Sequence, residues 1–347
     1  MITALLVAVL SKYISPLLFW LPAFFGLAFP YLFLLNLLFI IYWFIQFKHP
    51  FVFGLIAALL SVTTAYRYVQ FSSDESASAK SIKVTSYNCM LFDLYNWSKN
   101  KEARSSILGS LSDINPDILC LQEFYTSEEP GDYNNIDTVK KMFGISNYHV
   151  EFTTTLRGFD HWGIATFSKY PIVNQGKIIF NTRTNNICIF TDVLVNHDTI
   201  RVYNLHLQSI SFSKQDNKFL EDVISDKDAE DEMEKSKNIL RRLKRAFVKR
   251  TRQVEMIALH MKTCRHRIIL CGDFNDTAAS FAYQKLSGNL KDAFIEKGNG
   301  FGRTYAGKWP QFRIDYILHD KRLKCLKYQR YEETFTDHFP ITAFFKQ

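Results

Sequence analysis

The amino-terminal part of the chain is almost free of charge. Within residues 2–47 the only charged residue is Lys12, and within residues 51–69 it is Arg67. A helix needs roughly 20 apolar residues to cross a bilayer, and this stretch holds enough for several. It is too long for a cleaved signal peptide, and no Lys or Arg precedes Lys12. We therefore expect a retained membrane anchor and not a soluble domain.

Prolines and one short polar segment divide this apolar stretch. We expect a helical transmembrane region over residues 1–70, with about three spans near 2–21, 29–47 and 51–69. Pro22 and Pro30 lie around the first break, and together with Pro16 they leave open that one span is instead broken into an interfacial piece. Lys48-His49-Pro50 sets the second break.

Basic residues near the span ends bear on orientation. Lys48 lies in the second loop, and cytoplasmic loops carry an excess of Lys and Arg. With three spans, everything after residue 70 then lies on the extracytoplasmic side of a bacterial-type inner membrane. Arg67 argues for the opposite orientation. The expected partner of residues 1–70 is the lipid bilayer, and the sequence identifies no protein partner.

The remaining chain has the pattern of a globular α/β domain. Residues 71–81 are small and polar and predict a linker, which leaves 82–347 as one domain. Runs rich in β-branched and aromatic residues predict strands at 82–88, 117–122, 162–168, 171–180, 187–195, 199–207, 267–272, 312–319 and 341–345. Helices are expected at 101–113, 135–143, 278–287 and, in pieces, 217–262. Adjacent strands form hairpins, as at Asn196-His197-Asp198, so we expect a sandwich of mixed sheets.

Residues 221–252 separate their charges. An acidic half, 221–234, precedes a basic half, 235–252, at helical spacing. A basic helix of this kind can contact anionic lipid or a polyanionic substrate. The helix dipole alone also favours acids near the amino terminus and bases near the carboxyl terminus. From the sequence we favour a solvated amphipathic helix over a binding surface.

An acid, an amide or a histidine ends or follows most of the expected strands. These residues are Asn88, Glu123, His206, Asp273, Asn275, Asp315, Asp337 and His338. A single one would be explained as an ordinary strand end, but together they describe a hard-cation site with acid–base groups. Carboxylate and amide oxygens suit Mg²⁺ or Mn²⁺, whereas zinc would need more His or Cys. Because magnesium usually completes its shell with water and substrate phosphate, the expected reaction is hydrolysis of a phosphate ester.

Seven short motifs, in this order, resemble those of the endonuclease/exonuclease/phosphatase superfamily. They are SYN at 86–88, LQE at 121–123, GIATFSKYPI at 163–172, NLHLQS at 204–209, GDFND at 272–276, RIDYIL at 313–318 and TDHFPI at 336–341. The superfamily includes DNase I-like nucleases, neutral sphingomyelinases and inositol-phosphate phosphatases. The resemblance covers about 82–346 and implies a DNase I-like fold: a four-layer α/β/β/α sandwich with the active site where the sheets meet at one edge.

The resemblance implies a metal site and the groups that act on water and phosphate. Glu123 would be the main ligand of Mg²⁺ or Mn²⁺, aided by Asn88 and Asp337. Asp273 would orient or deprotonate the attacking water. Asn275 would bind the phosphoryl oxygen as negative charge develops there.

The same resemblance assigns roles to two histidines. His338 would contact the phosphate or act as a base, and Asp315 would fix its tautomer. His206 would protonate the leaving group or bind the phosphate. Arg303 is a further candidate for lining the substrate groove, although an ordinary loop position explains it equally well.

Departures from the family patterns restrict the substrate. NLHLQS replaces the Tyr-bearing motif of abasic-site nucleases, and GDFND lacks the Arg of inositol-phosphate phosphatases. We expect a membrane-anchored, divalent-metal-dependent phosphoesterase that acts on nucleic acid or on a phospholipid headgroup, and the net charge of +8 suits either. The alternative is a catalytically inactive relative that binds phosphorylated ligands or partners at the membrane, although no polar residue of the expected set is missing.

Overall fold

The computed structural model describes residues 1–73, 81–129, 131, 133–180, 184–210, 229–307, 311–332 and 335–346, without the side chains of 229–235. Most of the predicted linker at 71–81 and of the acidic half at 221–234 therefore lies outside the described residues.

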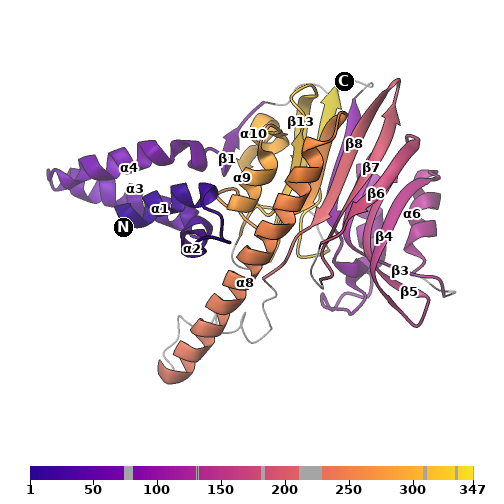
Figure 1. Cartoon of the computed structure of the whole chain (residues 1–347), viewed down its shortest axis with the longest axis horizontal. Coiled ribbons are helices and arrows are strands. Elements are labelled where there is room, and N and C mark those ends of the chain that lie inside the picture. Colours follow the sequence, from indigo (N-terminus) through magenta and orange to yellow (C-terminus); the bar gives the residue numbers. More distant parts are fainter. Residues whose placement is uncertain are drawn as a thin grey trace.

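Two six-stranded sheets form the centre of the molecule (Figure 1). The first has the order β10 (Lys291–Asp292), β12 (Asp315–His319), β9 (Arg267–Asp273), β8 (Asp198–His206), β7 (Ile187–Val195) and β6 (Ile172–Ile178). The second has the order β13 (Lys324–Arg330), β14 (Ile341–Lys346), β2 (Ile82–Asn88), β3 (Ile118–Ser127), β5 (Asp160–Ser168) and β4 (Asn147–Leu156). The β8–β9 and β2–β3 pairs are parallel and their neighbours are antiparallel. Both sheets are therefore mixed, which confirms the predicted sheet type.

Apolar side chains from the facing sides of the two sheets form one core cluster. Val84 and Ile118 of the second sheet meet Val202 and Ile269 of the first sheet, all fully buried. The strand sequences produce this packing because alternate residues of a strand point to opposite faces of its sheet.

Helices cover the outer face of each sheet. On the second sheet lie α5 (Ala103–Ile114) and α6 (Asn135–Phe143), which bury Ile107, Leu111 and Val139. On the first sheet lie α8 (Ala229–Lys262) and α9 (Phe281–Ser287), followed along the chain by α10 (Ala293–Lys297). The prediction of α8 in pieces was wrong, because residues 229–262 form one continuous helix, which runs well beyond the sheets (Figure 1).

Strands that the sequence did not predict lie mostly at sheet edges. β4 and β13 are the two outer strands of the second sheet, and edge strands carry polar and charged residues that weaken the strand pattern. The predicted hairpin is confirmed, because Val195 pairs with Asp198 across a two-residue turn. Asn196 has φ +57 in that turn, as such turns require.

The amino-terminal region consists of helices joined by short breaks: α1 (Ile2–Leu10), η1 (Ser11–Tyr13), α2 (Leu21–Leu27), α3 (Phe29–Ile45) and α4 (Pro50–Ala65). The predicted first span at 2–21 is not one helix, because the helical structure ends at Tyr13 and resumes at Leu21. Within the described residues, no single helix has the length and apolar character to cross a bilayer. By length and composition alone, α2 and α3 together are long and apolar enough to cross a bilayer, with a bend of 67° between them.

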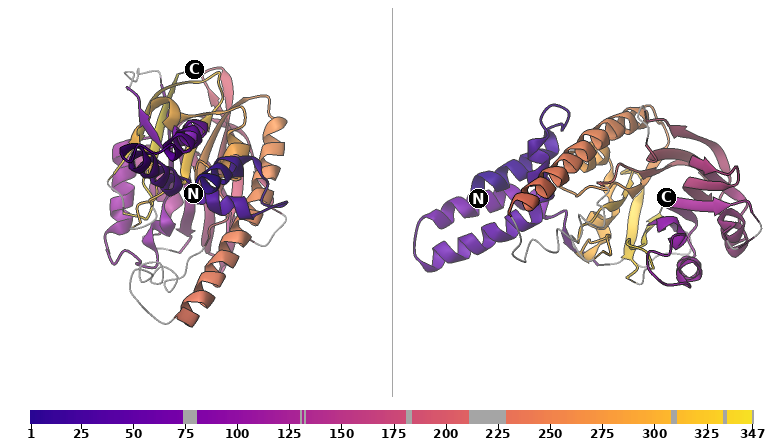
Figure 2. Two further views of the ribbon diagram at one scale, coloured as in Figure 1. Left: turned by 90° about the vertical axis from the view of Figure 1, so that its left-hand side faces the viewer. Right: turned by 90° about the horizontal axis from the view of Figure 1, so that it is seen from below.

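This helical region packs against one end of the sandwich (Figure 2). The short strand β1 (Val69–Phe71) pairs with β11 (Asn299–Phe301). The guanidinium of Arg67 donates to the carbonyl of Ala278 at 2.9 Å and to Gln284 at 2.7 Å. Arg67 therefore joins the apolar helices to α9, which gives this charge a structural role.

Candidate active site

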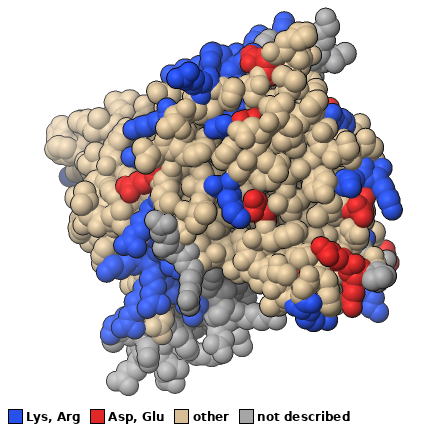
Figure 3. All heavy atoms as spheres, turned by 45° about the vertical axis from the view of Figure 1, so that its right-hand side comes forward, with Lys and Arg blue, Asp and Glu red and all other residues tan. Residues whose placement is uncertain are grey.

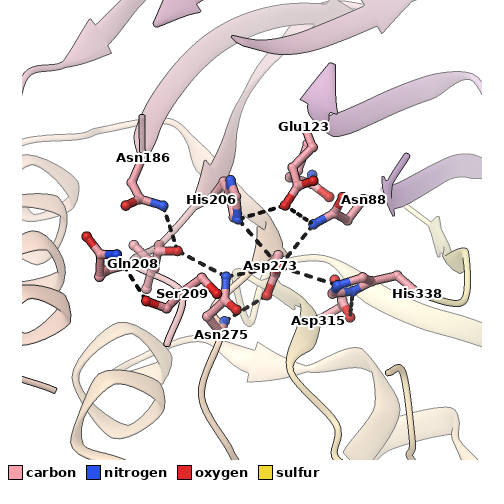
Figure 4. A network of polar contacts seen from close by, with 12 residues as sticks. Asn88, Glu123, Asn186, His206, Gln208, Ser209, Asp273, Asn275, Asp315 and His338 are labelled. Atoms are coloured by element: carbon pink, nitrogen blue, oxygen red, sulfur yellow. Dashed lines mark hydrogen bonds and ion pairs between the residues drawn. The ribbon is translucent and has the colours of Figure 1, made fainter. Parts of the chain in front are cut away.

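Strand pairing brings the predicted residues together at one edge of the sandwich. His206 ends β8 and Asp273 ends β9, and the two are register partners in the parallel pair. Asp315 begins β12 directly opposite Asp273. Asn88 ends β2 of the other sheet. Figure 4 shows that these side chains point toward one another.

Asp273 is the centre of this network and is 1% exposed. One carboxylate oxygen accepts from the Asn275 backbone N–H at 2.7 Å, and the other accepts from Asn88 Nδ2 and Asn275 Nδ2 at 3.1 Å each. Burial, followed by the negative charge of Asp315, raises the pKa of Asp273 to about 6. The group is therefore mostly ionised at neutral pH, yet basic enough to accept a proton.

Asp315 and His338 form a buried pair. Nδ1 of His338 lies 2.9 Å from Oδ2 of Asp315, and a carboxylate in this place holds the proton on Nδ1. Nε2 then faces Asp273, with 3.7 Å between the two atoms. Burial opposes the charged imidazolium, but the charges of Asp315 and Asp273 outweigh it and raise the pKa of His338 well above its usual value.

Glu123 approaches Asn88 from a bulge in β3. The β3–β5 register shifts between Leu121 and Phe124, and Glu123 has φ +47. This irregular backbone turns the carboxylate toward Asn88, whose Nδ2 donates to Oε1 at 3.3 Å. Burial and the nearby charge of Asp337 raise the pKa of Glu123. Glu123 and Asp337 line the same groove of about 920 Å³, which extends past Trp97 and offers space for a substrate.

His206 lies between the two carboxylates without a close hydrogen bond. Its Nε2 is 3.6 Å from Glu123 Oε1 and 3.7 Å from Asp273 Oδ2. Nε2 is buried and makes no hydrogen bond with any residue that the structure describes. Burial lowers the pKa of His206, since the neighbouring carboxylates compensate only in part.

Two groups of side chains could hold a cation here. Of the predicted set, Glu123 and Asp337 line the groove with carboxylate oxygens, whereas buried Asn88 turns its Nδ2 toward Glu123 and its Oδ1 accepts from the backbone N–H of Met90 at 3.1 Å. The ligand atoms of Asp273, Asp315 and His338 lie within 4.8 Å of one another and form a second, fully buried group. Both groups consist of carboxylates with an amide or one imidazole, which is the donor set of a hard cation.

Two predicted side chains are already held by protein contacts. Nδ2 of Asn275 donates to the carbonyl of Leu207 at 3.0 Å, so this amide joins the ends of β8 and β9. The guanidinium of Arg303 lies over the ring of Phe339, 5.0 Å from its centroid. The roles of Asn275 and Arg303 toward phosphate stay predictions.

A polar bridge between the two sheets was missed by the sequence analysis. Nε2 of Gln122 donates to Oδ1 of Asn204 at 2.6 Å, and Nδ2 of Asn204 donates to the carbonyl of Ala165 at 2.8 Å. Both amides are fully buried. Gln122 precedes Glu123, and Asn204 is two residues before His206, so the bridge fixes the strands that carry the site. The sequence signal for this bridge was that Gln122 lies in the LQE motif and Asn204 in the NLHLQS motif.

A second missed contact involves Asp276. It does not cap α9, because Ser280 is the N-cap of that helix and its hydroxyl accepts from Tyr283 N–H. Asp276 instead accepts from Nε of buried Arg250 at 3.0 Å, and Arg250 also donates to the carbonyl of Gln208 at 2.8 Å. Arg250 thus connects the segments that follow β8 and β9.

Two mixed sheets with buried carboxylates, amides and histidines at their shared edge define the DNase I-like class of metal-dependent phosphoesterases. A family model described as the endonuclease/exonuclease/phosphatase family matches residues 85–338. The chain belongs to this family. A second family model, for a domain of unknown function, matches residues 1–68, and no curated protein sequence matches the chain.

Solved structures share the fold at low sequence identity. A family member from Bacteroides thetaiotaomicron has 17% identity and a TM-score of 0.55, and the alignment covers 76% of this chain and 97% of that one. A mannosyl-6-phosphatase from the same species has 16% identity, a TM-score of 0.55, and coverage of 77% and 100%. The human Nocturnin catalytic domain with bound sulfate has 15% identity, a TM-score of 0.52, and coverage of 79% and 97%.

Proposed function

We propose that the protein is a membrane-anchored phosphoesterase that hydrolyses a phosphodiester or phosphomonoester by attack of water, with Mg²⁺ or Mn²⁺ bound. The observation that carries the proposal is the environment of Asp273. A buried carboxylate with a pKa raised to about 6 lies between two histidines and two amides at the edge of a groove. A general base needs a pKa near the working pH, and this arrangement supplies one.

The donor set fits a divalent cation. Glu123 and Asp337 bring two negative charges to one wall of the groove, and their repulsion contributes to the raised pKa of Glu123. A cation there would relieve this repulsion and would neutralise charge on the phosphoryl group. In this proposal Glu123 is the main ligand, with Asp337 beside it, and Asn88 orients Glu123 through its 3.3 Å hydrogen bond.

The remaining roles belong to the chain's own side chains. Asp273 accepts the proton of the attacking water, while the amides of Asn88 and Asn275 hold its carboxylate in place. His338 keeps its proton on Nδ1 through Asp315 and presents Nε2–H toward the phosphate. His206 lies on the other side of Asp273, in reach of the leaving oxygen.

Residues 1–70 are proposed as the anchor, 71–81 as the linker and 82–347 as the catalytic domain. The support is the outward surface of α3 and α4, where Leu38, Phe44, Phe53 and Leu59 are each more than half exposed. Exposed apolar surface of this extent is characteristic of contact with lipid. The substrate is then a phosphate ester at the membrane, a phospholipid headgroup or nucleic acid on the extracytoplasmic side.

The test uses the purified full chain in neutral detergent with bis-p-nitrophenyl phosphate. Asp273→Asn and His338→Ala should each lower metal-dependent turnover by about 10²-fold or more, because each removes a group that handles a proton or charge in the reaction. Asp113→Asn and His197→Ala are the matched controls, since both residues are exposed and neither belongs to the polar network of the site (Figure 4). Wild-type turnover in both site variants would refute the assignment.

A substrate panel then separates the remaining possibilities. DNA, RNA, sphingomyelin, inositol phosphates and a sugar phosphate are compared, the last because one structural neighbour is a mannosyl-6-phosphatase. If no ester is hydrolysed with either Mg²⁺ or Mn²⁺, the protein is an inactive relative that binds phosphorylated ligands. A reporter fused after residue 347 that is active only in the cytoplasm would, if active, refute the extracytoplasmic placement.

A further inference from the structure

A basic pocket of about 440 Å³ lies beside the catalytic centre. One wall is the segment Gln208, Ser209 and Ile210, which follows His206, and the other is α8 with Arg242, Arg245, Ala246 and Lys249. The three cations are spaced by three and four residues, so they lie on one face of the helix. Figure 3 shows Lys and Arg side chains gathered at the lower left of that view.

The wall next to the catalytic centre is fixed by buried side chains. The backbone N–H of Gln208 donates to Gln253 at 2.9 Å, and its carbonyl accepts from Arg250 at 2.8 Å. Asn186 donates to the carbonyl of Leu207 at 2.8 Å. Because Gln253 and Arg250 are almost fully buried, this wall is held in place before any ligand binds, which lowers the entropic cost of binding.

The pocket is strongly positive among the residues that the structure describes. No described carboxylate forms an ion pair with Arg245 or Lys249. Asp276, the second acidic residue of the neighbouring GDFND motif, pairs instead with Arg250. Clustered cations in a concave site attract anions, and guanidinium groups match the geometry of phosphate oxygens.

The next face of α8 contacts the apolar amino-terminal region. Ile239, Leu243 and Phe247 pack against Phe24 and Leu27 of α2. The same cluster includes Ile210 from the pocket wall. The pocket therefore adjoins the proposed membrane anchor.

Exposed apolar side chains lie next to this contact. Leu18 is 89% exposed and Phe19 is 52% exposed in the segment before α2. The Lys244 ammonium lies over the ring of Trp20, 4.6 Å from its centroid. Basic side chains beside exposed Leu and Phe and a partly exposed Trp are characteristic of a surface that lies at the membrane interface, with the cations at headgroup level.

We propose that this pocket binds the phosphate of an anionic phospholipid in the membrane to which the protein is anchored. The inference rests on the proposed membrane association, and it replaces the solvated-helix interpretation for residues 242–249. The bound headgroup would lie next to the segment that begins at His206, so that the catalytic centre is oriented over the bilayer surface.

The test follows acetylation of Lys249 by mass spectrometry in the full chain, reconstituted in nanodiscs of phosphatidylcholine with or without phosphatidylglycerol. We expect phosphatidylglycerol to slow acetylation of Lys249 at least threefold. Lys262, an exposed lysine at the carboxyl end of the same helix and outside the pocket, is the internal control. Equal protection of both lysines would mean that phosphatidylglycerol acts only through general surface charge, and it would overturn the proposal that the pocket binds lipid. The absence of any protection of Lys249 would overturn it as well.

Two further arms separate the source of the phosphate and the contribution of the pocket. Inorganic phosphate added to neutral nanodiscs should not protect Lys249, and equal protection would identify a free phosphate ligand and overturn the lipid assignment. Arg242→Gln with Arg245→Gln should abolish the protection by phosphatidylglycerol. Arg241→Gln with Arg252→Gln, two exposed cations of α8 outside the pocket, should keep it. The opposite pattern would overturn the proposal.

Hydrolysis of bis-p-nitrophenyl phosphate by the wild type is measured in the same nanodiscs. Turnover without protection of Lys249 means that only the pocket proposal fails. Protection without turnover means that the proposed hydrolytic function fails while the lipid site stands.

Discussion

Gly272 is the position where one added methyl group should do most damage to the site. It precedes Asp273 in β9, pairs with Leu205 of β8 and has φ +141, a conformation that favours glycine. A Cβ at this position would lie 2.0 Å from the Leu205 carbonyl oxygen, which is backbone and cannot rotate away. The backbone conformation alone costs an alanine about 1–3 kcal/mol. Moving β8 and weakening one or two ladder hydrogen bonds adds about 0.5–1.5 kcal/mol for each bond.

Gly272→Ala should therefore destabilise the catalytic domain by about 2–6 kcal/mol. For a domain of this size that lowers the thermal midpoint by on the order of 10 °C. Thermal unfolding of the full chain in detergent measures this, together with turnover at a temperature where the variant is still folded. Turnover should fall as well, because the movement of β8 relative to β9 displaces His206 from Asp273.

Two other glycines separate the cost of the backbone conformation from the cost of the steric clash. Gly144 ends α6 with φ +63 and has open space around it, so Gly144→Ala tests backbone conformation without a clash. Gly109 lies in α5 with open space and ordinary φ, so Gly109→Ala should stabilise by about 1 kcal/mol. The reasoning is refuted if Gly272→Ala costs no more than Gly144→Ala.

Three further predictions concern the buried polar groups and the metal. Burial disfavours ionisation of Asp192, but hydrogen bonds from Arg201 at 2.6 and 2.7 Å and from Asn174 outweigh it and hold the pKa of Asp192 below its usual value. This pair therefore stabilises the fold above the unfolded-state pKa of about 3.9, and its contribution is lost as the pH falls through the lower folded-state pKa. Asp192→Asn should lower the thermal midpoint at pH 7 and make the midpoint less sensitive to acid, whereas exposed Asp113→Asn should do neither. Equal midpoints of the wild type and Asp192→Asn at pH 7 would contradict this. Asn204→Leu removes the closest acceptor of the buried Gln122 amide, at 2.6 Å, and leaves two acceptors at 3.3 Å, so it should cost about 1–3 kcal/mol in thermal unfolding. An unchanged midpoint would show that the bridge between the sheets is dispensable. Chelation with EDTA should remove turnover of bis-p-nitrophenyl phosphate, and Mg²⁺ or Mn²⁺ should restore it; full activity after chelation excludes the proposed metal dependence.

The convergence of the site could be predicted from the sequence because its residues end strands. Asp273 and His206 follow apolar runs that pair in parallel, so their ends must lie at the same edge of the sheet. Asn88 and Glu123 are similarly related by the parallel β2–β3 pair of the other sheet. The pattern along the chain carries this information, because strand direction determines which ends meet.

The supporting contacts could not be predicted in the same way. Arg250 belongs to a helix rich in Lys and Arg, and nothing in its local sequence separates it from its exposed neighbours Arg252 and Arg245. Only the packing of α8 on the first sheet buries its guanidinium against Asp276. Only Pro16 signalled the break after Tyr13, since apolar composition continues through the stretch where the helix ends. Hydropathy reports composition and not the positions at which the backbone turns.

The two histidines show how the surroundings select a role that residue type leaves open. Both are largely buried, and burial alone disfavours the charged form of each. For His338 the carboxylate of Asp315 at 2.9 Å reverses that effect and raises the pKa. For His206 no carboxylate of the described residues comes closer than 3.6 Å, and the pKa is lowered. At neutral pH, His338 therefore carries positive charge toward the phosphate, and His206 is neutral. We infer that His338 stabilises charge on the phosphoryl oxygens and that neutral His206 binds a phosphate oxygen through a ring N–H or accepts a proton. Different surroundings give two histidines of one site different pKa values, and this allows them different roles in the reaction.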